Sequence, residues 1–367
     1  MALLFTPYQL RDVRLRNRIV VSPMCEYSSV DGFANDWHLV HLGSRAVGGA
    51  ALVLTEAIAV SPEGRISPDD LGIWKDDHIE MLARIARFCN ERGAAWGTQL
   101  AHAGRKGSTL APWLGTGAAA PAAGGWIPVG PGTEPFDATY PVPAPLDEAG
   151  IERIIADFAR AAQRTLAAGG QVIELHAAHG YLIHQFLSPL VNKRTDRWGG
   201  SFENRTRLAI AVARSVRTVW PERFPLFVRI SASDWVDGGW DIEQSVELAK
   251  LLKPEGVDLI DASSGGAVNI PRSAIPVGPL YQTPFAERIR RDAEIATGAV
   301  GMITEPADAE AIVAGGRADL VIMARELLRD PYWPLYAARA LGADAPWPSQ
   351  YERAAGNRAT MHVNVPA

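Results

Sequence analysis

Short apolar runs recur along most of the chain and alternate with longer stretches in which apolar residues return every three or four positions. The short runs are apolar at consecutive positions, which is typical of strands covered on both faces. The longer stretches have the period of amphipathic helices. The runs predict eight strands, at 19–21, 51–55, 95–100, 172–175, 226–230, 259–260, 297–300 and 320–323. The predicted helices between them include 77–92, 147–168, 203–219, 242–253 and 306–314.

This alternation of strand and helix predicts an α/β fold with a parallel sheet. Eight strand–helix units favour a closed (β/α)8 TIM barrel, which fits one domain over residues 1–367. The main competitor is an open doubly wound sheet. That fold normally carries a glycine fingerprint after its first strand, where this chain has Ser22-Pro23-Met24-Cys25.

The stretch 109–145 differs from the rest because it is rich in Gly, Pro and Ala, with Trp113, Trp126 and Tyr140 interspersed. It follows the third predicted strand, so in a barrel it rises from the face that carries the active site. We therefore expect an elaborated loop insertion that acts as a lid over that site.

Composition supports a compact folded protein, since 47% of the 367 residues are hydrophobic and 21% are charged. The formal net charge of −5 argues against a protein that binds nucleic acid by neutralising phosphates. Cys25 and Cys89 show no spacing typical of a disulfide framework or zinc site, which favours reduced thiols in the cytoplasm. The first residues lack the basic segment and the long apolar stretch of a signal peptide, and no run approaches the roughly 18 apolar residues that span a bilayer, so we expect neither export nor membrane insertion.

Polar residues cluster at the predicted carboxyl ends of the strands, where side chains from separate segments meet at the mouth of a barrel. Such convergence is the strongest indication of catalysis in the chain. These residues are Cys25, Tyr27, Glu56, Gln99, His102, Arg105, Lys106, His176, His179, Tyr181, Arg229 and Arg325.

The segment Glu174-Leu-His176-Ala-Ala-His179-Gly-Tyr181 holds two imidazoles three positions apart, which on a helix would share one face. They could bind a metal, donate hydrogen bonds to one substrate oxygen, or be satisfied locally within the barrel wall. A metal-dependent hydrolase or lyase is therefore an alternative function, resting on these two histidines with His102 and Glu56. No zinc signature supports it, and we expect no metal.

A second candidate site lies at the seventh and eighth predicted strands, through Gly301 and Arg325. Barrels often hold a phosphate there with backbone amides and a basic side chain. The same residues are equally compatible with a turn glycine and a surface ion pair.

Several ordered motifs together resemble Old Yellow Enzyme flavoproteins, specifically the thermophilic-type bacterial ene reductases. The resemblance covers nearly the whole chain and rests on the segments 5–8, 15–18, 22–25, 99–106, 174–181, 192–200, 227–231, 298–304, 325–331 and 350–353.

This resemblance implies a barrel that binds FMN, is reduced by NADPH or NADH, and reduces alkenes activated by a carbonyl or nitro group. Gln99 would meet the pyrimidine edge of the flavin, and Arg229 would stabilise negative charge at N1 and O2 of the reduced ring. The implied cofactor-binding residues are Ser22, Pro23, Met24, Cys25, Ala57, Gln99, Arg229, Gly301, Ala324 and Arg325.

The resemblance also implies the catalytic roles. His176 and His179 would hold the substrate oxygen while hydride passes from flavin N5 to the β-carbon, and Tyr181 would protonate the α-carbon. Tyr27 would line the substrate pocket, and Arg353 would reach the active site of a neighbouring subunit. The tail 346–367 would then lie at the interface of a homodimer or homotetramer.

Three features depart from the resemblance: Glu26 at a variable position, Ala324 where glycine is usual, and the long loop 109–145. The loop matters most because its aromatic residues would decide which substrates fit.

Overall fold

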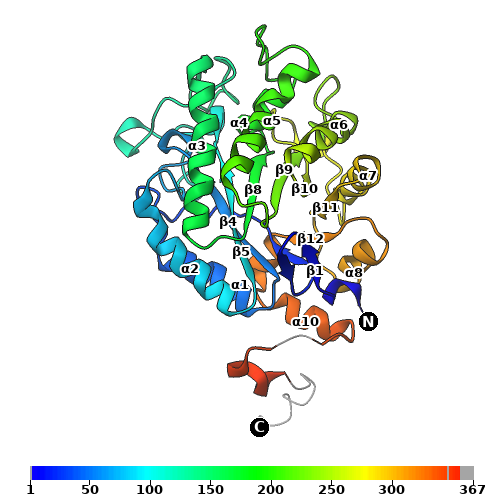
Figure 1. Cartoon of the computed structure of the whole chain (residues 1–367). Helices are drawn as coiled ribbons and strands as arrows, with labels where there is room; N and C mark the ends of the chain where they lie inside the picture. The colour runs from blue at the N-terminus through cyan, green and yellow to red at the C-terminus, as the bar shows by residue number, and fades with distance from the viewer. Residues whose placement is uncertain (1, 345–346, 356–367) are drawn as a thin grey trace.

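The computed structural model describes residues 2–344 and 347–355 and confirms the predicted barrel (Figure 1). Eight parallel strands close upon themselves in the order β10-β11-β12-β3-β4-β5-β8-β9. Each apolar run expected to form a strand overlaps one of them. The strands are β3 (Ile19–Val21), β4 (Leu52–Ala59), β5 (Ala95–Ala101), β8 (Val172–Ala177), β9 (Leu226–Ser231), β10 (Leu259–Ser263), β11 (Ala296–Ala299) and β12 (Leu320–Met323).

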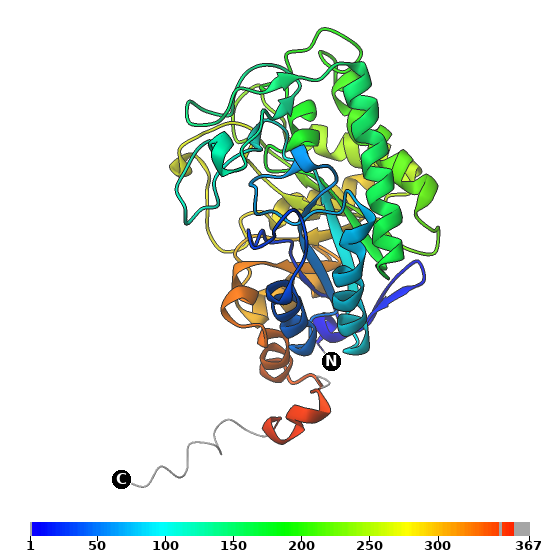
Figure 2. The same cartoon turned by 90° about the vertical axis from the view of Figure 1, so that its left-hand side faces the viewer.

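Helices surround the barrel and cover the outer faces of the strands (Figures 1 and 2). Asp147 caps the longest helix by accepting a hydrogen bond from the backbone of Gly150, at 2.8 Å. None of the helices in the described ranges is long and apolar enough to cross a membrane. The helices are α1 (Asp36–Val47), α2 (Ile79–Glu91), α3 (Glu148–Ala167), α4 (Leu182–Leu187), α5 (Phe202–Val219), α6 (Ile242–Leu252), α7 (Thr283–Ala293), α8 (Pro306–Ala314), α9 (Arg325–Arg329) and α10 (Trp333–Ala340).

An antiparallel hairpin of β1 (Tyr8–Leu10) and β2 (Val13–Leu15) closes the amino-terminal end of the barrel. Its buried side chains Leu10, Val13 and Leu15 form one apolar cluster with residues of the barrel strands, among them Phe227 and Leu259. This end of the barrel is therefore filled with apolar side chains. The sequence pattern missed this hairpin because each strand has a polar residue between two apolar ones and so lacks the run of consecutive apolar residues that revealed β3, which is equally short.

Two sequence expectations about local structure were wrong. Glu56 lies inside β4 rather than after it, because the β4–β5 register shifts between Leu54 and Ala57 and leaves Glu56 out of the ladder. His176 likewise lies inside β8, and His179 lies in the turn that follows. The two imidazoles therefore do not share a helical face. They meet because a strand end and a turn fold together.

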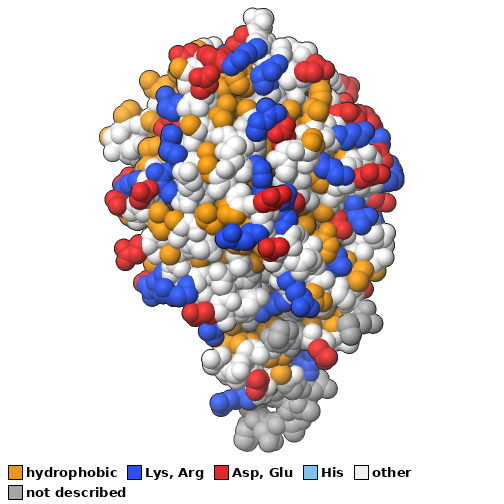
Figure 3. Space-filling view, in the orientation of Figure 1, with side chains coloured by type: hydrophobic (Ala, Val, Ile, Leu, Met, Phe, Trp, Pro, Cys, Tyr) orange, Lys and Arg blue, Asp and Glu red, His pale blue; other side chains and the backbone are white. Residues whose placement is uncertain are grey.

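The loop insertion 109–145 connects β5 to α3 and contains the two-residue strands β6 (Val129–Gly130) and β7 (Ala144–Pro145). In Figure 2 this cyan-to-green segment lies at the end of the barrel opposite the blue β1–β2 hairpin. The 3-10 helix η8 (Ser349–Ala354), in red, projects from the barrel near α10. On the face drawn in Figure 3, basic and acidic side chains are interspersed.

Candidate active site

Strand register brings the polar residues of the barrel interior together. Gln99 on β5 lies opposite Glu174 on β8. His176 on β8 lies opposite Arg229 on β9, and Arg229 lies opposite Asp261 on β10. All five side chains are buried. Residues far apart in the sequence thus form one band of polar groups across four neighbouring strands.

Arg229 is the cation at the centre of this band. Its Nη1 donates a hydrogen bond to Oγ of Ser22 at 3.0 Å, and its Nε lies 3.1 Å from Oδ2 of Asp261. The Nε–H is not aligned for a hydrogen bond to any described residue, and neither oxygen of Asp261 has a hydrogen-bond partner there. A buried guanidinium with unused donors is suited to bind a polar ligand group.

Two buried acids accompany this single cation. Burial raises the pKa of Asp261 to about 6, although the charge of Arg229 lowers it. Burial and the nearby charge of Asp261 raise the pKa of Glu174 to about 8. Glu174 is therefore mainly protonated at neutral pH, and its Oε1 accepts a hydrogen bond from Nε2 of Gln99 at 2.8 Å. The ionised charges of the band are thus nearly balanced.

His176 and His179 approach each other edge to face, with Nε2 of His176 3.4 Å from Nδ1 of His179. Nδ1 of His176 accepts a hydrogen bond from the backbone N–H of Ala178 at 3.3 Å, which places the ring proton of His176 on Nε2. Nε2 of His179 lies 2.7 Å from Oγ of Ser263. The hydroxyl of Ser263 can donate or accept, so it decides which nitrogen of His179 carries the proton.

Both imidazoles are neutral at physiological pH. Burial lowers the pKa of His176 and of His179 well below the usual value, and the positive charge of Arg229 lowers both further. A neutral imidazole retains one N–H, so each ring can donate one hydrogen bond without bringing a charge into the site.

The turn that carries His179 is held by close backbone contacts. Gly180 has a φ of +74°, and a Cβ there would lie 1.8 Å from the carbonyl oxygen of Gly266. Only glycine allows this approach between the turn and the loop after β10. The backbone N–H of His179 donates to Oγ of Ser231 at 2.9 Å, and Lys106 donates to the carbonyl oxygen of His179 at 2.9 Å. These contacts fix the position of the second imidazole.

Tyr181 follows this turn, and its ring packs edge to face against His176 with centroids 4.9 Å apart. Burial raises the pKa of Tyr181 well above its usual value, so the phenol keeps its proton. Tyr181, Tyr27 and Lys106 line a cavity of about 470 Å³ together with residues of the loop insertion, including Tyr140. We call this cavity the mouth pocket.

A second cavity, of about 260 Å³, begins at Arg229 and extends over the carboxyl ends of β11 and β12. We call it the cationic pocket, because Arg229, Arg272, Arg325 and Arg329 line it with Glu326 as the acid. Within residues 2–344 and 347–355, no hydrogen bond or ion pair engages the guanidinium of Arg325. Gly301 and Ala324 also line this pocket. Gly301, Ala324 and Arg325, to which the resemblance assigns the phosphate, therefore line one cavity.

The segment Ser22 to Tyr27 follows β3, and its second half is anchored to residues outside the barrel interior. Glu56 accepts a hydrogen bond from the backbone N–H of Glu26 at 3.3 Å and lies 3.2 Å from Nε2 of His38 on α1. Glu26 in turn lies 3.2 Å from Nε2 of His41. Burial and the charges of Asp70 and Glu56 raise the pKa of the Cys25 thiol, so it stays protonated rather than acting as a thiolate nucleophile.

The structure brings most of the expected site residues together. Ser22 and Ala57 are buried, Gln99 and Arg229 lie in the band, and Pro23, Met24 and Cys25 are half-buried beside them. Arg353 is the exception, since it is exposed on η8, which projects from the barrel (Figure 2). The remaining tail residues 346 and 356–367 lie outside the described residues.

The sequence analysis did not identify three residues that contact Arg229 or His179. These are Asp261, which pairs with Arg229, and Ser231 and Ser263, which contact His179. Asp261 had a detectable signal, because it is an acid that directly follows the apolar residues Leu259 and Ile260 of a predicted strand. The two serines had none. In the part of the chain that the structure describes, no three His, Cys, Asp or Glu side chains gather as a metal would require. His102 instead accepts a hydrogen bond from the backbone of Gly104 at 3.0 Å.

The fold and the site together define a (β/α)8-barrel enzyme with a polar band, a cation-lined pocket and a pair of neutral imidazoles at its mouth. The profile of the NADH:flavin oxidoreductase / NADH oxidase family matches residues 3–343. The chain is 49% identical over 353 residues to an NADPH dehydrogenase of Bacillus velezensis, covering 96% of this chain and 98% of the relative.

Solved structures agree. Morphinone reductase, an Old Yellow Enzyme, superposes with a TM-score of 0.76 at 26% identity, covering 93% of this chain and 90% of its own. A 2-naphthoyl-CoA reductase superposes with a TM-score of 0.83 at 26% identity, covering 93% of this chain, although this chain spans only 52% of that longer protein.

The chain belongs to the NADH:flavin oxidoreductase / NADH oxidase family, in its Old Yellow Enzyme group. It is an NAD(P)H-dependent oxidoreductase that uses FMN and acts on a small molecule. The Nε donor of Arg229 and the guanidinium of Arg325, which have no hydrogen-bond partner among the described residues, fit a cofactor with a polar ring edge and a phosphate. The comparisons give no support to a metal-dependent hydrolase or lyase.

Proposed function

We propose that this enzyme reduces the C=C bond of α,β-unsaturated carbonyl or nitro compounds. One observation carries the proposal. Two neutral imidazoles present nitrogen atoms 3.4 Å apart beside a protonated tyrosine, at the junction of the mouth pocket and the polar band. This arrangement offers two hydrogen-bond donors to one oxygen and a separate proton to a neighbouring carbon.

The polar band and the cationic pocket supply the residues that would hold FMN. Ser22, Pro23, Met24, Cys25 and Ala57 would contact the ring system, and Gln99 and Arg229 would bind its polar edge. Gly301, Ala324 and Arg325 would bind the phosphate. When bound, FMN supplies the hydride that it receives from the nicotinamide.

His176 and His179 would bind the carbonyl or nitro oxygen of the substrate. His176 donates from Nε2, because its Nδ1 accepts from Ala178. His179 donates from Nδ1 when the hydroxyl of Ser263 donates to its Nε2. The two donors then point at one acceptor and stabilise the negative charge that develops on the oxygen as the β-carbon gains hydride.

Tyr181 would supply the proton that completes the reaction at the α-carbon. Its raised pKa keeps the phenol protonated over the whole physiological range. Lys106 lies 5.3 Å from the Tyr181 ring, so its charge can stabilise the phenolate that forms on proton transfer. The proton is then restored from solvent through the mouth pocket.

Two further parts of the chain complete the proposed site. The loop insertion 109–145 would act as a lid, since its residues form a wall of the mouth pocket. Arg353 would enter the mouth pocket of a partner subunit in a homodimer or homotetramer, with the tail 346–367 at the interface. Its exposed position outside its own barrel supports this role, because it leaves the side chain available to a neighbour.

The proposal is tested by anaerobic spectroscopy. The purified protein should be yellow, lose its flavin absorbance when NADPH is added, and regain it when cyclohexenone follows. A protein that takes up FMN and is bleached by NADPH, but is not reoxidised by any activated alkene, would refute the proposed alkene reduction. The assignment to the flavin oxidoreductase family would still hold.

Replacing Tyr181 by phenylalanine should lower the turnover of cyclohexenone about 10²-fold, because a positioned general acid contributes at least this much. Bleaching of the flavin by NADPH needs no proton from Tyr181 and serves as the internal control. Stopped-flow measurement of the two half-reactions separates them. Equal losses of rate in the two half-reactions would show that Tyr181 acts in folding or flavin binding rather than as the proton donor.

Trp113 is expected to limit substrate size. It is 65% exposed on the loop insertion, and its ring meets Tyr27 of the mouth pocket edge to face at 5.8 Å. Trp113→Ala should raise kcat/KM for a bulky 3-substituted cyclohexenone relative to cyclohexenone by about tenfold, because it removes the ring that packs against Tyr27 at the edge of the pocket. Ile127→Ala is the matched control, since Ile127 is 73% exposed on the same loop and, unlike Trp113, has no ring that packs against Tyr27. An unchanged ratio in Trp113→Ala would contradict this role.

A further inference from the structure

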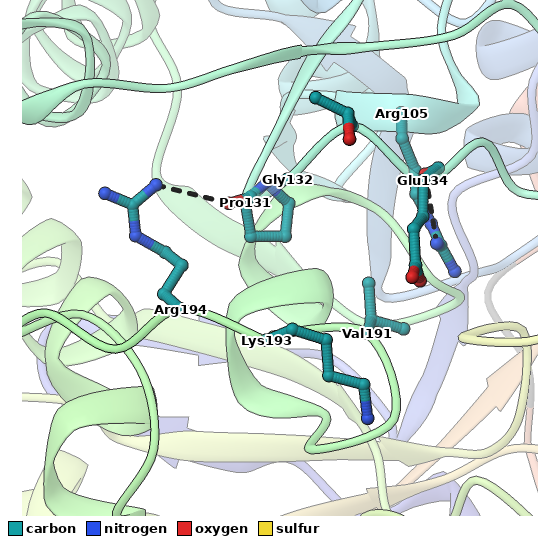
Figure 4. A pocket seen from close by; sticks show the side chains of 8 residues that line it. Arg105, Pro131, Gly132, Glu134, Val191, Lys193 and Arg194 are labelled. Carbon is teal, nitrogen blue, oxygen red and sulfur yellow. Dashed lines mark hydrogen bonds between the residues drawn. The ribbon is translucent and has the colours of Figure 1, made fainter.

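A cavity of about 210 Å³ lies next to the mouth pocket and has no part in the function proposed above (Figure 4). We call it the rim cavity. Arg105 lines the rim cavity, and the next residue, Lys106, lines the mouth pocket. Both cations lie over the ring of Phe136, at 5.9 and 4.4 Å from its centroid. The two cavities are therefore direct neighbours at the mouth of the barrel.

Positive side chains dominate the rim cavity. Figure 4 shows Arg194 on one side, Arg105 and Glu134 on the other, and Lys193 between them. Asp196 forms an ion pair with Arg194 and offsets its charge. Lys193 donates to the backbone oxygen of Pro189 at 2.8 Å, and no ion pair within residues 2–344 and 347–355 engages it. Arg105 and Lys193 thus face the single carboxylate of Glu134, which leaves an excess of one positive charge.

Arg105 is buried in the wall of this cavity and held there by hydrogen bonds. It is 5% exposed, and its Nη2 donates to the backbone oxygen of Ala267 at 2.8 Å. Its Nη1 makes a longer contact, 3.3 Å, with the backbone oxygen of Glu134. Its Nε has no partner among the described residues. A buried guanidinium held by carbonyl oxygens, with a donor unused, is suited to an anionic ligand.

The backbone opposite these cations leaves room for a ligand. A Cβ added at Gly132 would meet no atom within 4 Å, so this residue faces open space in the cavity. Gly132 does not have a positive φ, and a side chain can therefore be introduced there without backbone strain. This feature makes the charge of the cavity adjustable by a single substitution.

We propose that the rim cavity binds the 2′-phosphate of NADPH, and this inference rests on the proposed function. A phosphate monoester carries up to two negative charges and matches the charge-assisted donors of an arginine and a lysine. The cavity adjoins the mouth pocket, and if the nicotinamide reaches the flavin through that pocket, the adenosine half of the same molecule would lie along the rim. NADH lacks this phosphate, and the cavity would therefore favour NADPH.

The test is isothermal titration calorimetry of the oxidised, FMN-loaded protein with three probes: adenosine 2′,5′-bisphosphate, 5′-AMP and inorganic phosphate. We expect the bisphosphate to bind about tenfold more tightly than 5′-AMP, as one charge-assisted contact provides. Equal affinities for the two nucleotides would overturn the proposal. If inorganic phosphate binds as tightly as the bisphosphate, the cavity is a site for the free ion, and the nucleotide assignment is wrong.

Gly132→Glu and Gly132→Gln are the matched pair of variants, because they add side chains of equal size and differ only in charge. We expect Gly132→Glu to remove the preference for the bisphosphate and Gly132→Gln to weaken it less. Lys193→Gln should lower the NADPH-to-NADH ratio of kcat/KM about tenfold through KM, while Lys250→Gln on α6 leaves it unchanged. Identical behaviour of the two Gly132 variants would refute an electrostatic site.

Failure of this inference can be told apart from failure of the proposed function. The titrations use the oxidised protein and need no turnover, so they report on the rim cavity whatever the alkene chemistry is. A protein that NADPH reduces and cyclohexenone reoxidises, but that binds both nucleotides equally, would retain its function and lose this site.

Discussion

Replacing His176 and His179 together by alanine is expected to lower the turnover of an activated alkene by about 10³-fold or more, because loss of one preorganised donor already costs 10² to 10³. The two nitrogens that face each other at 3.4 Å would be removed, and the substrate oxygen would find no neutral N–H in their place. Steady-state kinetics with cyclohexenone measures the effect. Flavin absorbance at the same protein concentration confirms that the cofactor is retained.

The matched controls are His176→Asn and His179→Asn, which keep an N–H donor on a shorter side chain. Each should retain more activity than the corresponding alanine variant. The pH dependence adds a separate check. Since burial and the charge of Arg229 hold the pKa of both imidazoles well below the usual value, activity should show no loss from their titration between pH 6.5 and 8. Turnover within tenfold of the wild type in the double alanine variant would exclude the oxyanion role.

Replacing Arg229 by methionine should weaken FMN binding at least about tenfold and make the flavin potential more negative. Arg229 is the cation of the polar band, and FMN gains negative charge on reduction, so removing the guanidinium destabilises the reduced form more than the oxidised one. Fluorescence titration with FMN measures the affinity, and a reductive titration against a dye measures the potential.

This substitution also leaves Asp261 buried without its cation, which by itself costs about 3–5 kcal/mol of folding stability. The double variant Arg229→Met/Asp261→Asn removes the stranded carboxylate and serves as the folding control. Arg229→Lys keeps the positive charge but lacks the planar guanidinium with its several N–H donors. Its FMN affinity and flavin potential should therefore change less than those of Arg229→Met. An unchanged potential in a folded double variant would refute the assigned role of Arg229.

Much of the fold could be predicted, because strands buried on both faces leave consecutive apolar residues that local inspection detects. The helix at 147–168 was equally visible through its period and its capping Asp147. The β1–β2 hairpin was missed, because a polar residue lies between the two apolar ones in each of its strands. The bulge that turns Glu56 toward α1 was missed as well, because a bulge depends on how the neighbouring strand pairs.

The candidate site was predictable in its residue types but not in its contacts. His176, His179, Tyr181 and Arg229 stood out as polar side chains near strand ends, and the resemblance assigned them roles. The spacing of the two histidines left their local structure open, since three residues suit a helix and a strand followed by a turn alike. The mouth pocket and the rim cavity left no trace in the local pattern, because their walls come from segments distant in the chain.

The amino-acid sequence by itself determined the order of strands and helices and the presence of two imidazoles, a phenol and a guanidinium in a reducing enzyme of this family. Only the tertiary structure decided which atoms of these groups face one another. Nε2 of His176 meets Nδ1 of His179 because Gly180 lets the turn approach Gly266, and because Ser263 on β10 reaches the far side of the ring. The physical reason is that strand register and close backbone approach depend on contacts between segments far apart in sequence, which no local pattern of side chains specifies.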